Sequence, residues 1–364
     1  MKKHILYIVP HRFNRSPGQR FRCEHFIPHL KANGFEIEYA NLLNAWDDRN
    51  FYKRRNYFLK FFIVLKTYFR RARQLAKVQQ YDAVFIYREA FMLGTTRFER
   101  KIKHKGVPII FDFDDAIWLN DVSDANKELK WLKRPEKTGE ICKLASLVIV
   151  GNNYLADYAR QFNQNVAVVP TTIDTSYHKP LTGQKPGDLI RIGWTGSSTT
   201  LKHFRLLVPV LEKLQKAFGG QLKIRVIADA GIEDERIEVE NVPWTAGDEI
   251  QRLSEIDIGV MPLPDDPWAK GKCGFKGLQY MSMGIPAVMS PVGVNTEIIE
   301  HEVNGFLAET NTEWETILRK LIVDADLRMQ IGDKGRQTIN ERYSIEANKD
   351  LYLELFYQMV GLNQ

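Results

Sequence analysis

Short hydrophobic runs alternate with amphipathic segments along the first half of the chain. The runs have the composition of buried β-strands and read HILYIVP, FEIEYANL, YDAVFIYR, VPIIFDFDD, SLVIVGN and VAVVPT. Between them, hydrophobic positions recur with helical spacing from Phe21 to Ala32, through a basic segment, up to Lys105-Gly106, from Lys127 to Leu144 and in YLADYARQF. This alternation predicts a parallel sheet with helices on both faces.

A second alternating series follows a stretch without periodicity. Residues 176–189 are rich in Pro and Gly, and we interpret them as a linker. The strands and helices expected after it are IRIGWTGS, a helix near Thr200 to Phe218, KIRVIAD, DEIQRLSEI, DIGVMPL, a helix from Phe275 to Met283 and a strand from Ala287 to Pro291. Long helical patterns close the chain, including IEANKDLYLELFYQMVG.

The length of 364 residues suggests two domains, at roughly 150 residues per domain. We therefore predict an α/β protein with two Rossmann-like, doubly wound domains facing a cleft. The expected bounds are residues 1–180 and 181–345. A C-terminal helix, residues 346–364, is expected to pack back on the first domain.

Composition is that of an ordinary globular protein, with 44% hydrophobic and 26% charged residues. The three cysteines, Cys23, Cys142 and Cys273, are scattered and show no spacing typical of a zinc site, which favours a reducing, cytosolic compartment. The N-terminus reads as a first strand, not a signal peptide. No apolar run approaches the roughly 18 residues of a membrane span.

Positive charge is concentrated in one segment. Phe51 to Tyr81 contains nine basic residues and no acidic one: Lys53, Arg54, Arg55, Lys60, Lys66, Arg70, Arg71, Arg73 and Lys77. Because these nine exceed the net charge of +6, the rest of the chain is slightly acidic. This distribution argues against a nucleic-acid-coating protein and for one local basic patch.

The same segment is amphipathic. Positions 58, 61, 62, 65, 69 and 72 fall on one helical face, and most of the basic residues fall on the other. A cationic helix rich in Phe and Tyr suits an anionic membrane surface or a lipid-linked acceptor, so residues 51–77 are a candidate peripheral membrane contact. The alternative is an ordinary helix that covers the sheet and leaves its basic face in water.

Two loops place lysine unusually early in a helix. GWTGSSTTLKHF puts Lys202 in a first turn, and GKCGFK does the same with Lys276. A helix begins with partial positive charge, so a cation there is unfavourable unless an anion completes the site. We predict a phosphate or pyrophosphate site at Gly196, Ser197, Thr199, Lys202, Gly274, Phe275 and Lys276. The alternative is that both lysines extend into water.

Neither loop has the spacing of the best-known nucleotide motifs. The first strand is not followed by GxGxxG, and the chain contains no GxxxxGK[ST] sequence. Dinucleotide-dependent redox chemistry and nucleoside triphosphate hydrolysis are therefore disfavoured.

The segment GFKGLQYMSMGIPAVMSPVGVNTEII resembles the nucleotide-sugar-binding segment of retaining glycosyltransferases of family 4, which have the GT-B fold. SEIDIGVMPL is similar to the strand that precedes it in that family, and VVPTTIDT to the segment that closes the N-terminal domain. SPGQRFRCEHFIPHLKANG resembles the first loop and helix, with only Gly18 in place of the usual Gly-Gly.

The resemblance implies roles for individual residues of the second half. Gln279 occupies the second Glu of the family's motif, which holds the ribose hydroxyls, and Gly271 occupies the first. Lys276 matches a lysine of relatives that carry a K-x-x-E-Y-M variant of the motif, and Lys202 matches a phosphate-binding lysine of the first loop in this domain. Trp244, in the expected loop NVPWTAGD, is a candidate for packing or for stacking on the nucleotide base.

The first half is expected to supply the acceptor side and part of the catalytic centre. FDFDDAIW offers Asp112, Asp114 and Asp115 at a strand end, and the last two are candidates to hydrogen-bond sugar or acceptor hydroxyls or to cap a helix. A metal at this DxD-like pattern is the less favoured alternative, because GT-B enzymes generally use lysines and helix termini instead. Further acceptor-side candidates are Gly18, Arg20, Arg22, Arg88 and Glu89.

The resemblance thus implies a metal-independent, retaining glycosyltransferase that uses a nucleotide diphosphate sugar and a glycan or lipid-linked acceptor. Lys202, Lys276, Asp114 and Asp115 are the expected catalytic residues, and bacterial surface polysaccharide synthesis is the expected setting. Two alternatives stay open: a nucleotide-sugar 2-epimerase, and a degenerate domain that binds nucleotide or glycan without turnover.

Overall fold

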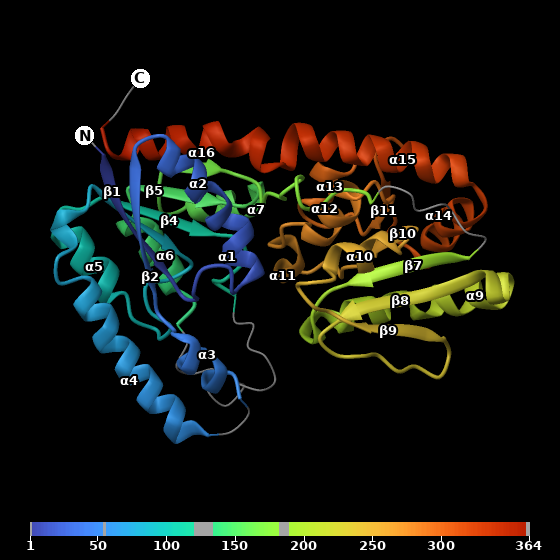
Figure 1. Cartoon of the computed structure of the whole chain (residues 1–364), viewed down its shortest axis with the longest axis horizontal. Coiled ribbons are helices and arrows are strands. Elements are labelled where there is room, and N and C mark those ends of the chain that lie inside the picture. Colours follow the sequence, from blue (N-terminus) through green and yellow to red (C-terminus); the bar gives the residue numbers. More distant parts are fainter. Residues whose placement is uncertain (1, 54–55, 120–133, 182–188, 362–364) are drawn as a thin grey trace. The chain divides into compact units, whose positions relative to one another are not determined.

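The computed structural model describes residues 2–53, 56–119, 134–181 and 189–361. The chain forms two compact units, one of Met1–Thr172 with Asn348–Gln364 and one of Ile173–Ala347 (Figure 1). The first division therefore comes earlier in the chain than residue 180. Most of the expected linker, residues 182–188, lies outside the described residues.

The first unit is built on a six-stranded sheet in which every neighbouring pair is parallel, as the alternating pattern predicts. Its spatial order is β2-β1-β3-β4-β5-β6. The strands are β1 (Lys3–Val9), β2 (Phe35–Asn41), β3 (Ala83–Tyr87), β4 (Ile109–Phe113), β5 (Leu147–Val150) and β6 (Val166–Val168). Strands β3, β4 and β5 are buried along their whole length, which explains why they read as continuous hydrophobic runs.

Helices cover this sheet. They are α1 (Pro17–Arg22), α2 (Ile27–Ala32), α3 (Ala45–Phe51), α4 (Tyr57–Gln74), α5 (Arg97–His104), α6 (Lys137–Leu144) and α7 (Asn153–Arg160), with 3-10 turns at Glu24–Phe26 and Val78–Gln80. The single helix expected from Phe21 to Ala32 is wrong. Cys23 leaves the helical conformation, and Pro28 falls in the first turn of a new helix because it has no N–H to donate. The helix expected from Lys127 begins among residues outside the described part.

The chain returns to the first unit through α16 (Ile345–Met359). Tyr352 stacks on Phe26, with ring centroids 4.1 Å apart, and its hydroxyl lies 3.5 Å from that of Tyr7. Phe356 packs edge-to-face on Phe35. The last helix thus completes the aromatic core of the unit that the first strand begins.

The second unit repeats the same architecture. Its six strands are parallel in the order β12-β11-β10-β7-β8-β9. The strands are β7 (Ile190–Thr195), β8 (Leu222–Ala228), β9 (Val239–Pro243), β10 (Ile258–Met261), β11 (Ala287–Met289) and β12 (Phe306–Leu307). Two expectations are corrected here: Asn241–Pro243 of the expected loop belong to β9, and β11 ends at Met289, before Pro291.

The helices of the second unit are α8 (Leu201–Phe204), α9 (Val208–Phe218), α10 (Glu249–Ser254), α11 (Pro267–Lys270), α12 (Phe275–Ser282), α13 (Asn295–Ile298), α14 (Asn311–Val323) and α15 (Ala325–Thr338). Short 3-10 turns at Ser198–Thr200, Arg205–Leu207 and Gly219–Gln221 and a π-helical turn at Ile339–Tyr343 complete it. The expected helix from Thr200 to Phe218 is therefore segmented, with Pro209 in the first turn of α9.

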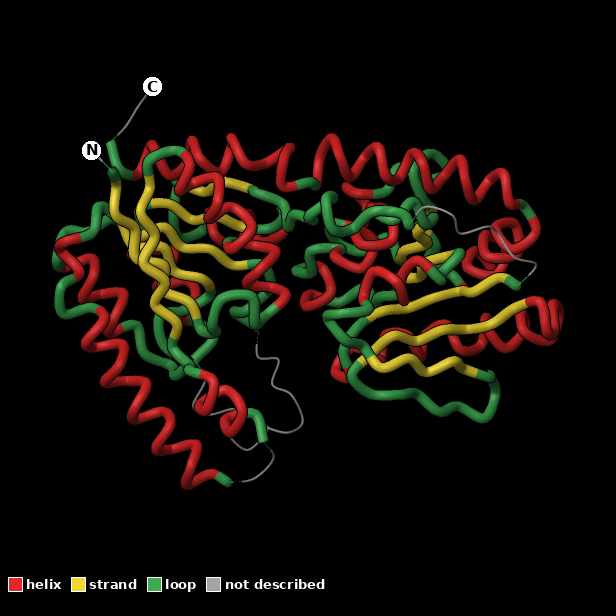
Figure 2. Tube along the Cα trace, in the orientation of Figure 1, coloured by secondary structure: helices red, strands yellow, loops and turns green. Residues whose placement is uncertain are grey.

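Hydrophobic clusters lie on both faces of the second sheet. One contains Trp194, Phe204 and Leu318, and the other contains Leu278, Tyr280 and Met289. Burial on both faces is typical of parallel sheets, and in each unit the strands run among helices (Figure 2). The loops at the carboxyl ends of the strands are then the places where polar side chains can meet a ligand.

Candidate functional site

The two lysine loops of the second unit follow neighbouring strands. β7 and β10 are paired in the sheet. The loop after β7 leads through a 3-10 turn into α8, and the segment after β10 leads through α11 into α12. Because the carboxyl ends of paired parallel strands lie at one edge of the sheet, the two helix beginnings are brought together.

The positive charges of three lysines act on His203. This histidine follows Lys202 in α8 and is buried. Burial, together with the positive charge of Lys272, Lys202 and Lys276, lowers the pKa of His203 to about 4. Lys202 and Lys276 thus both act electrostatically on His203, and Lys272, which is absent from the predicted site, acts with them.

Two of these ammonium groups lie over indole rings. Lys276 Nζ is 5.3 Å from the ring centroid of Trp194, and Lys272 Nζ is 5.4 Å from that of Trp268. An aromatic face attracts a cation without neutralising it, so the positive potential at His203 persists.

The start of α12 depends on the backbone of Gly274. This residue is the N-cap, with φ at +66°, a backbone conformation that residues other than glycine rarely adopt. A Cβ atom here would lie 2.4 Å from Ile298 Cδ1. Gly274 thus lets the first turn of α12, with Phe275 and Lys276, emerge directly from the preceding loop.

The loop after β7 is held by bonds within the protein. Gly196 N–H donates to Ile227 O at 3.0 Å, Ser197 N–H to Thr200 Oγ1 at 3.2 Å, and Ser198 N–H to Asp229 Oδ1 at 2.5 Å. These amides, expected to face an anion, are already engaged. What the loop offers outward is Lys202 and the exposed hydroxyls of Ser197 and Thr199, whose oxygens lie 2.8 Å apart.

Gln279 belongs to a buried polar group around Glu249. Gln279 Nε2 donates to Glu249 Oε1 at 3.0 Å, and Trp244 Nε1 donates to the same oxygen at 3.2 Å. His178 Nε2 lies 3.9 Å from the other carboxylate oxygen. Gln279 and Glu249 are buried, and Trp244 is 36% exposed. Sequence reasoning missed Glu249, which supplies a carboxylate beside the position where Gln279 lacks one.

In the first unit, four of the predicted residues come together at the ends of β3 and β4. Arg88 Nε donates to Asp114 Oδ1 at 2.9 Å, and its terminal nitrogen lies 2.5 Å from Asp115 Oδ2. Tyr87 O–H donates to Asp114 Oδ1 at 2.9 Å. A Cβ atom on Gly18 would lie 2.8 Å from the Tyr87 hydroxyl and 3.3 Å from Asp114, so the absence of a side chain lets the first loop approach this pair.

The backbone of Arg88 is left-handed, with φ at +63°. A long side chain in this region is strained, and such strain persists where surrounding contacts hold it. Burial opposes ionisation of Asp114, but Arg88 and then Arg22 outweigh it, so the pKa of Asp114 lies below its usual value. Asp114 is therefore held as an anion against arginine.

Arg22 and Asp112 form a buried pair beneath this network. Arg22 donates through Nε and Nη2 to the two oxygens of Asp112, at 3.2 and 2.7 Å, and through Nη1 to Val169 O. Burial raises the pKa of Asp112 to about 6, although Arg22 opposes the shift. Both side chains are fully enclosed, which indicates that they hold β4 and α1 together and do not contact a ligand.

The two remaining predicted residues lie elsewhere in the first unit. Arg20 donates to Asn14 Oδ1 at 3.3 Å, and its guanidinium stacks over Phe21. Glu89 pairs with Lys137. Within the described part of the chain, no three His, Cys, Asp or Glu side chains gather in a way that could hold a metal ion.

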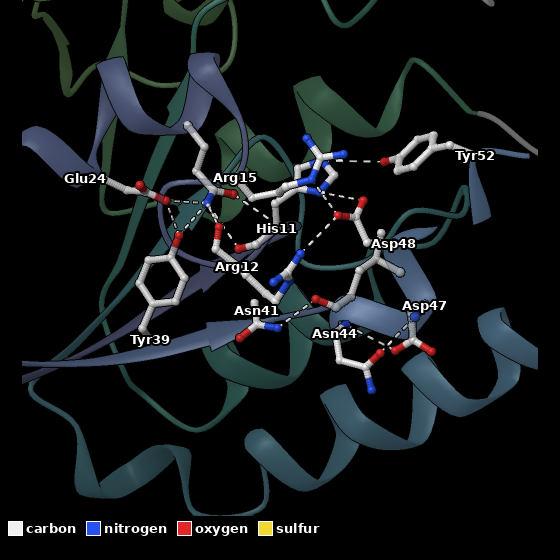
Figure 3. Close-up of polar contacts among 12 residues, drawn as sticks. His11, Arg12, Arg15, Glu24, Tyr39, Asn41, Asn44, Asp47, Asp48 and Tyr52 are labelled. Carbon is white, nitrogen blue, oxygen red and sulfur yellow. Dashed lines mark hydrogen bonds and ion pairs between the residues drawn. The ribbon is translucent and has the colours of Figure 1, made fainter. Parts of the chain in front are cut away.

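A polar cluster after β1 was also missed (Figure 3). Asp48 accepts from Arg15 Nε at 2.6 Å and lies 3.5 Å from a terminal nitrogen of Arg12, and His11 Nε2 lies 3.5 Å from the Tyr52 hydroxyl. Burial and the nearby Arg15, Arg88 and Arg12 lower the pKa of His11, against the effect of Asp48.

Glu24 holds the loop between β1 and α1 through hydrogen bonds. It accepts from Gln19 Nε2 at 2.6 Å, from Asn14 N–H at 2.7 Å and from the Tyr39 hydroxyl. Gln19 Oε1 in turn accepts from His11 N–H at 3.1 Å. The only sequence signal for this arrangement is the polar loop between β1 and α1, whose partners come from other segments.

Comparison with known proteins gives a family for part of the second unit. Residues 190–324 match the family described as Glycosyl transferases group 1. Glycosyltransferase 1 domain-containing protein 1 of Xenopus tropicalis is 26% identical over 82 residues, 22% of this chain and 24% of that protein. An uncharacterized glycosyltransferase of Methanocaldococcus jannaschii is 27% identical over 167 residues, 42% of this chain and 40% of that one. The chain thus spans less than half the length of these curated relatives.

Solved structures match over the whole chain. A glycosyltransferase from Rickettsia africae aligns with a TM-score of 0.70 and 15% identity, covering 100% of both chains. HepE of Anabaena, crystallised with UDP-glucose, aligns with a TM-score of 0.66 and 14% identity, covering 98% of this chain and 99% of its own. At this identity the likeness shows the fold, the two-domain α/β fold of the GT-B class.

Proposed function

We propose that this protein is a glycosyltransferase that moves a sugar from a nucleoside diphosphate sugar to a hydroxyl of a glycan or lipid-linked acceptor. The observations that carry the proposal are the position of Lys276 over Trp194 of β7 and the positive potential that Lys202, Lys272 and Lys276 together exert at the buried His203. Three cations at one sheet edge suit a diphosphate, and they lie in the segment that matches Glycosyl transferases group 1. HepE, which shares the fold, was crystallised with UDP-glucose.

The donor is recognised by distinct parts of the second unit. The lysines and the α12 N-terminus hold the diphosphate. The hydroxyls of Ser197 and Thr199, in the loop after β7, donate to the same group. Gln279 and the carboxylate of Glu249 hold the ribose hydroxyls, since a carboxylate accepts the hydrogen bonds that the Gln279 amide alone makes weakly. The half-exposed indole of Trp244, oriented by its bond to Glu249, stacks on the base.

The first unit supplies the acceptor side. Asp114 and Asp115, both paired with Arg88, accept hydrogen bonds from acceptor or sugar hydroxyls. We propose that transfer proceeds with retention, with the acceptor proton taken by the leaving phosphate oxygen on the same face. The protein then acts by stabilising charge that grows on the diphosphate, without a metal ion. Synthesis of bacterial surface polysaccharide is the setting we propose.

Ligand-induced thermal stabilisation tests the donor site. We expect UDP or GDP, and the matching sugar conjugate, to raise Tm equally with and without EDTA, because binding at 100 times Kd adds about 2.7 kcal/mol. Loss of the effect with EDTA contradicts metal independence, and no stabilisation by any nucleotide at millimolar concentration contradicts the site.

Product analysis then separates the reactions. Transfer to an acceptor with the anomeric configuration kept supports the proposal. Conversion of the donor into its C2 epimer without acceptor identifies a 2-epimerase, and donor binding without turnover identifies a binding protein. The replacement of the first motif Glu by Gly271 makes this last outcome a real alternative.

A further inference from the structure

Five large hydrophobic side chains form an exposed stripe along α4. Phe58 is 77% exposed, Phe61 62%, Phe62 48%, Leu65 43% and Phe69 57%. Their spacing of three, four, seven and eleven residues from Phe58 places them on one side of the helix. We refer to these five residues as the α4 stripe.

The opposite side of α4 packs on the first unit, and it is partly polar. Lys60, Ile63, Thr67 and Arg71 are buried there. Arg71 donates to the carbonyl oxygens of Ala90 at 2.8 Å, Ala40 at 2.9 Å and Val9 at 3.3 Å. Arginine thus holds the helix to backbone carbonyls.

This orientation is the reverse of an ordinary surface helix. A helix that merely covers a sheet turns its apolar face inward and leaves its charges in water. Here the apolar face is outward and Arg71 is inward, so the sheet-covering alternative does not account for the stripe. A contiguous exposed apolar surface of this kind marks an interaction site.

Aromatic groups next to the stripe extend the same surface. Trp46 in α3 is 52% exposed, Tyr52 57% and Tyr57 46%. Lys66 Nζ lies 5.1 Å from the Trp46 ring. Figure 1 shows α3 beside the N-terminal half of α4, along the outer side of the first unit. Trp and Tyr prefer the boundary between lipid chains and water, where the ring is apolar and its polar atom stays hydrated.

The positive charge around the α4 stripe indicates what kind of surface it binds. Lys53, Lys66, Arg73 and Lys77 are exposed around the stripe, and residues 51–81 contain nine basic and no acidic residues. A second copy of the chain would bring two such segments together and repel. An anionic bilayer surface complements them instead.

We propose that α3 and α4 dock the first unit on an anionic bilayer, with the α4 stripe in the headgroup boundary and the neighbouring lysines and arginines at the lipid phosphates. The helix lies in the plane of the membrane. Consistently, none of the helices in the described residues is long and apolar enough to cross a bilayer.

Vesicle co-sedimentation of the full chain tests the proposal. The probes are phosphatidylcholine vesicles with and without phosphatidylglycerol, at physiological salt. We expect binding only to the anionic vesicles. The triple change Phe61→Ser, Phe62→Ser and Phe69→Ser should weaken it about tenfold or more, and Arg73→Gln and Lys77→Gln by about fivefold each.

Matched controls separate docking from folding and from general stickiness. Val323→Ser with Met329→Ser removes two side chains of the second unit that are 72% and 60% exposed, and vesicle binding should not change. The Tm of the stripe variant should equal that of the wild type, because the stripe makes few contacts within the unit. Nucleotide stabilisation should also be unchanged, so this proposal stands or falls independently of the donor site.

Three results would overturn the proposal. These are no binding to either vesicle, equal binding to both vesicles, and a wild-type dimer in light scattering that the stripe changes convert to monomer. The last result would assign the stripe to self-association.

Discussion

Lys276 and Trp194 form a cation–π pair, with Nζ 5.3 Å from the centre of the indole ring. Trp194 is buried at the end of β7, and Lys276 is in the first turn of α12. The pair therefore joins the two loops that the sequence predicts to share an anion. It also orients the ammonium group before any ligand arrives, which reduces the entropy lost on binding.

If the proposed transfer is correct, Lys276→Ala lowers kcat by about 100-fold or more, because it removes one donor that stabilises charge on the leaving diphosphate. Steady-state transfer assays measure this directly. Lys270→Ala is the matched control, since Lys270 is only half-buried and pairs with Asp265 at 3.0 Å, and it should change kcat less than about twofold. Near-wild-type turnover of the Lys276 variant would remove the assignment.

The pKa of His203 reports on the lysine cluster. An NMR titration should give a pKa of about 4 in the free protein. Lys272→Met should raise it, because one of the neighbouring charges is lost, and bound nucleoside diphosphate should raise it for the same reason. A value near 6.5 that none of these changes moves would contradict the convergence of the lysines.

The same histidine makes stability depend on pH. It stays neutral in the folded protein, while in the unfolded chain it takes up a proton below about pH 6.5. Its contribution is therefore complete above pH 6.5 and is lost as the pH falls toward 4, by roughly 3 kcal/mol. Chemical denaturation at several pH values should show this slope in the wild type and a smaller slope in His203→Gln. Equal slopes would show that other groups cause the effect.

The strained backbone of Arg88 predicts an unusual order of stability. Both Arg88→Ala and Arg88→Gly remove the pairs with Asp114 and Asp115, so both should destabilise the protein. Alanine must also adopt a φ of +63°, which glycine does at little cost. Arg88→Gly should thus be about 1 kcal/mol more stable than Arg88→Ala in denaturant unfolding. The reverse order, usual elsewhere, would show that the backbone relaxes.

Gln279 should not tolerate the Glu that the family motif has at this position. Gln279→Glu would replace the 3.0 Å bond to Glu249 by two adjacent carboxylates, and we expect a loss of about 2 kcal/mol at neutral pH. Adding Glu249→Gln restores an amide–carboxylate pair with the partners exchanged. Unfolding of the single and double variants tests this: the double variant should be more stable than Gln279→Glu alone. Additive losses would disprove the coupling.

Both parallel sheets could be predicted because their central strands are buried on both faces and are bounded by Gly, Pro and Asn. The sequence also allowed the prediction that the loops of Lys202 and Lys276 lie near each other, because paired parallel strands bring the loops that follow them to one edge of the sheet. Helix continuity was not, because Cys23 and Pro209 interrupt segments whose periodicity continues across them.

The hydrogen-bond partners of the site residues could not be predicted from the sequence. Glu249 reaches Gln279 from a helix thirty residues earlier, and Glu24, in the 3-10 turn after α1, meets Tyr39 of β2. The orientation of α4 was equally hidden, since an amphipathic pattern does not say which face is inward. Arg71 fixes the orientation of α4, because it donates to three backbone carbonyls of the first unit.

The return of α16 to the first unit constrains the order in which the protein can fold during synthesis. Tyr7, Phe26 and Phe35 leave the ribosome early, yet the rings that cover them, Tyr352 and Phe356, are made last. The second unit, whose residues are contiguous from Ile173 to Ala347, can close while the first still exposes an aromatic surface. Over that interval the aromatic core of the first unit lacks its cover, and the unit becomes complete only when α16 packs on it.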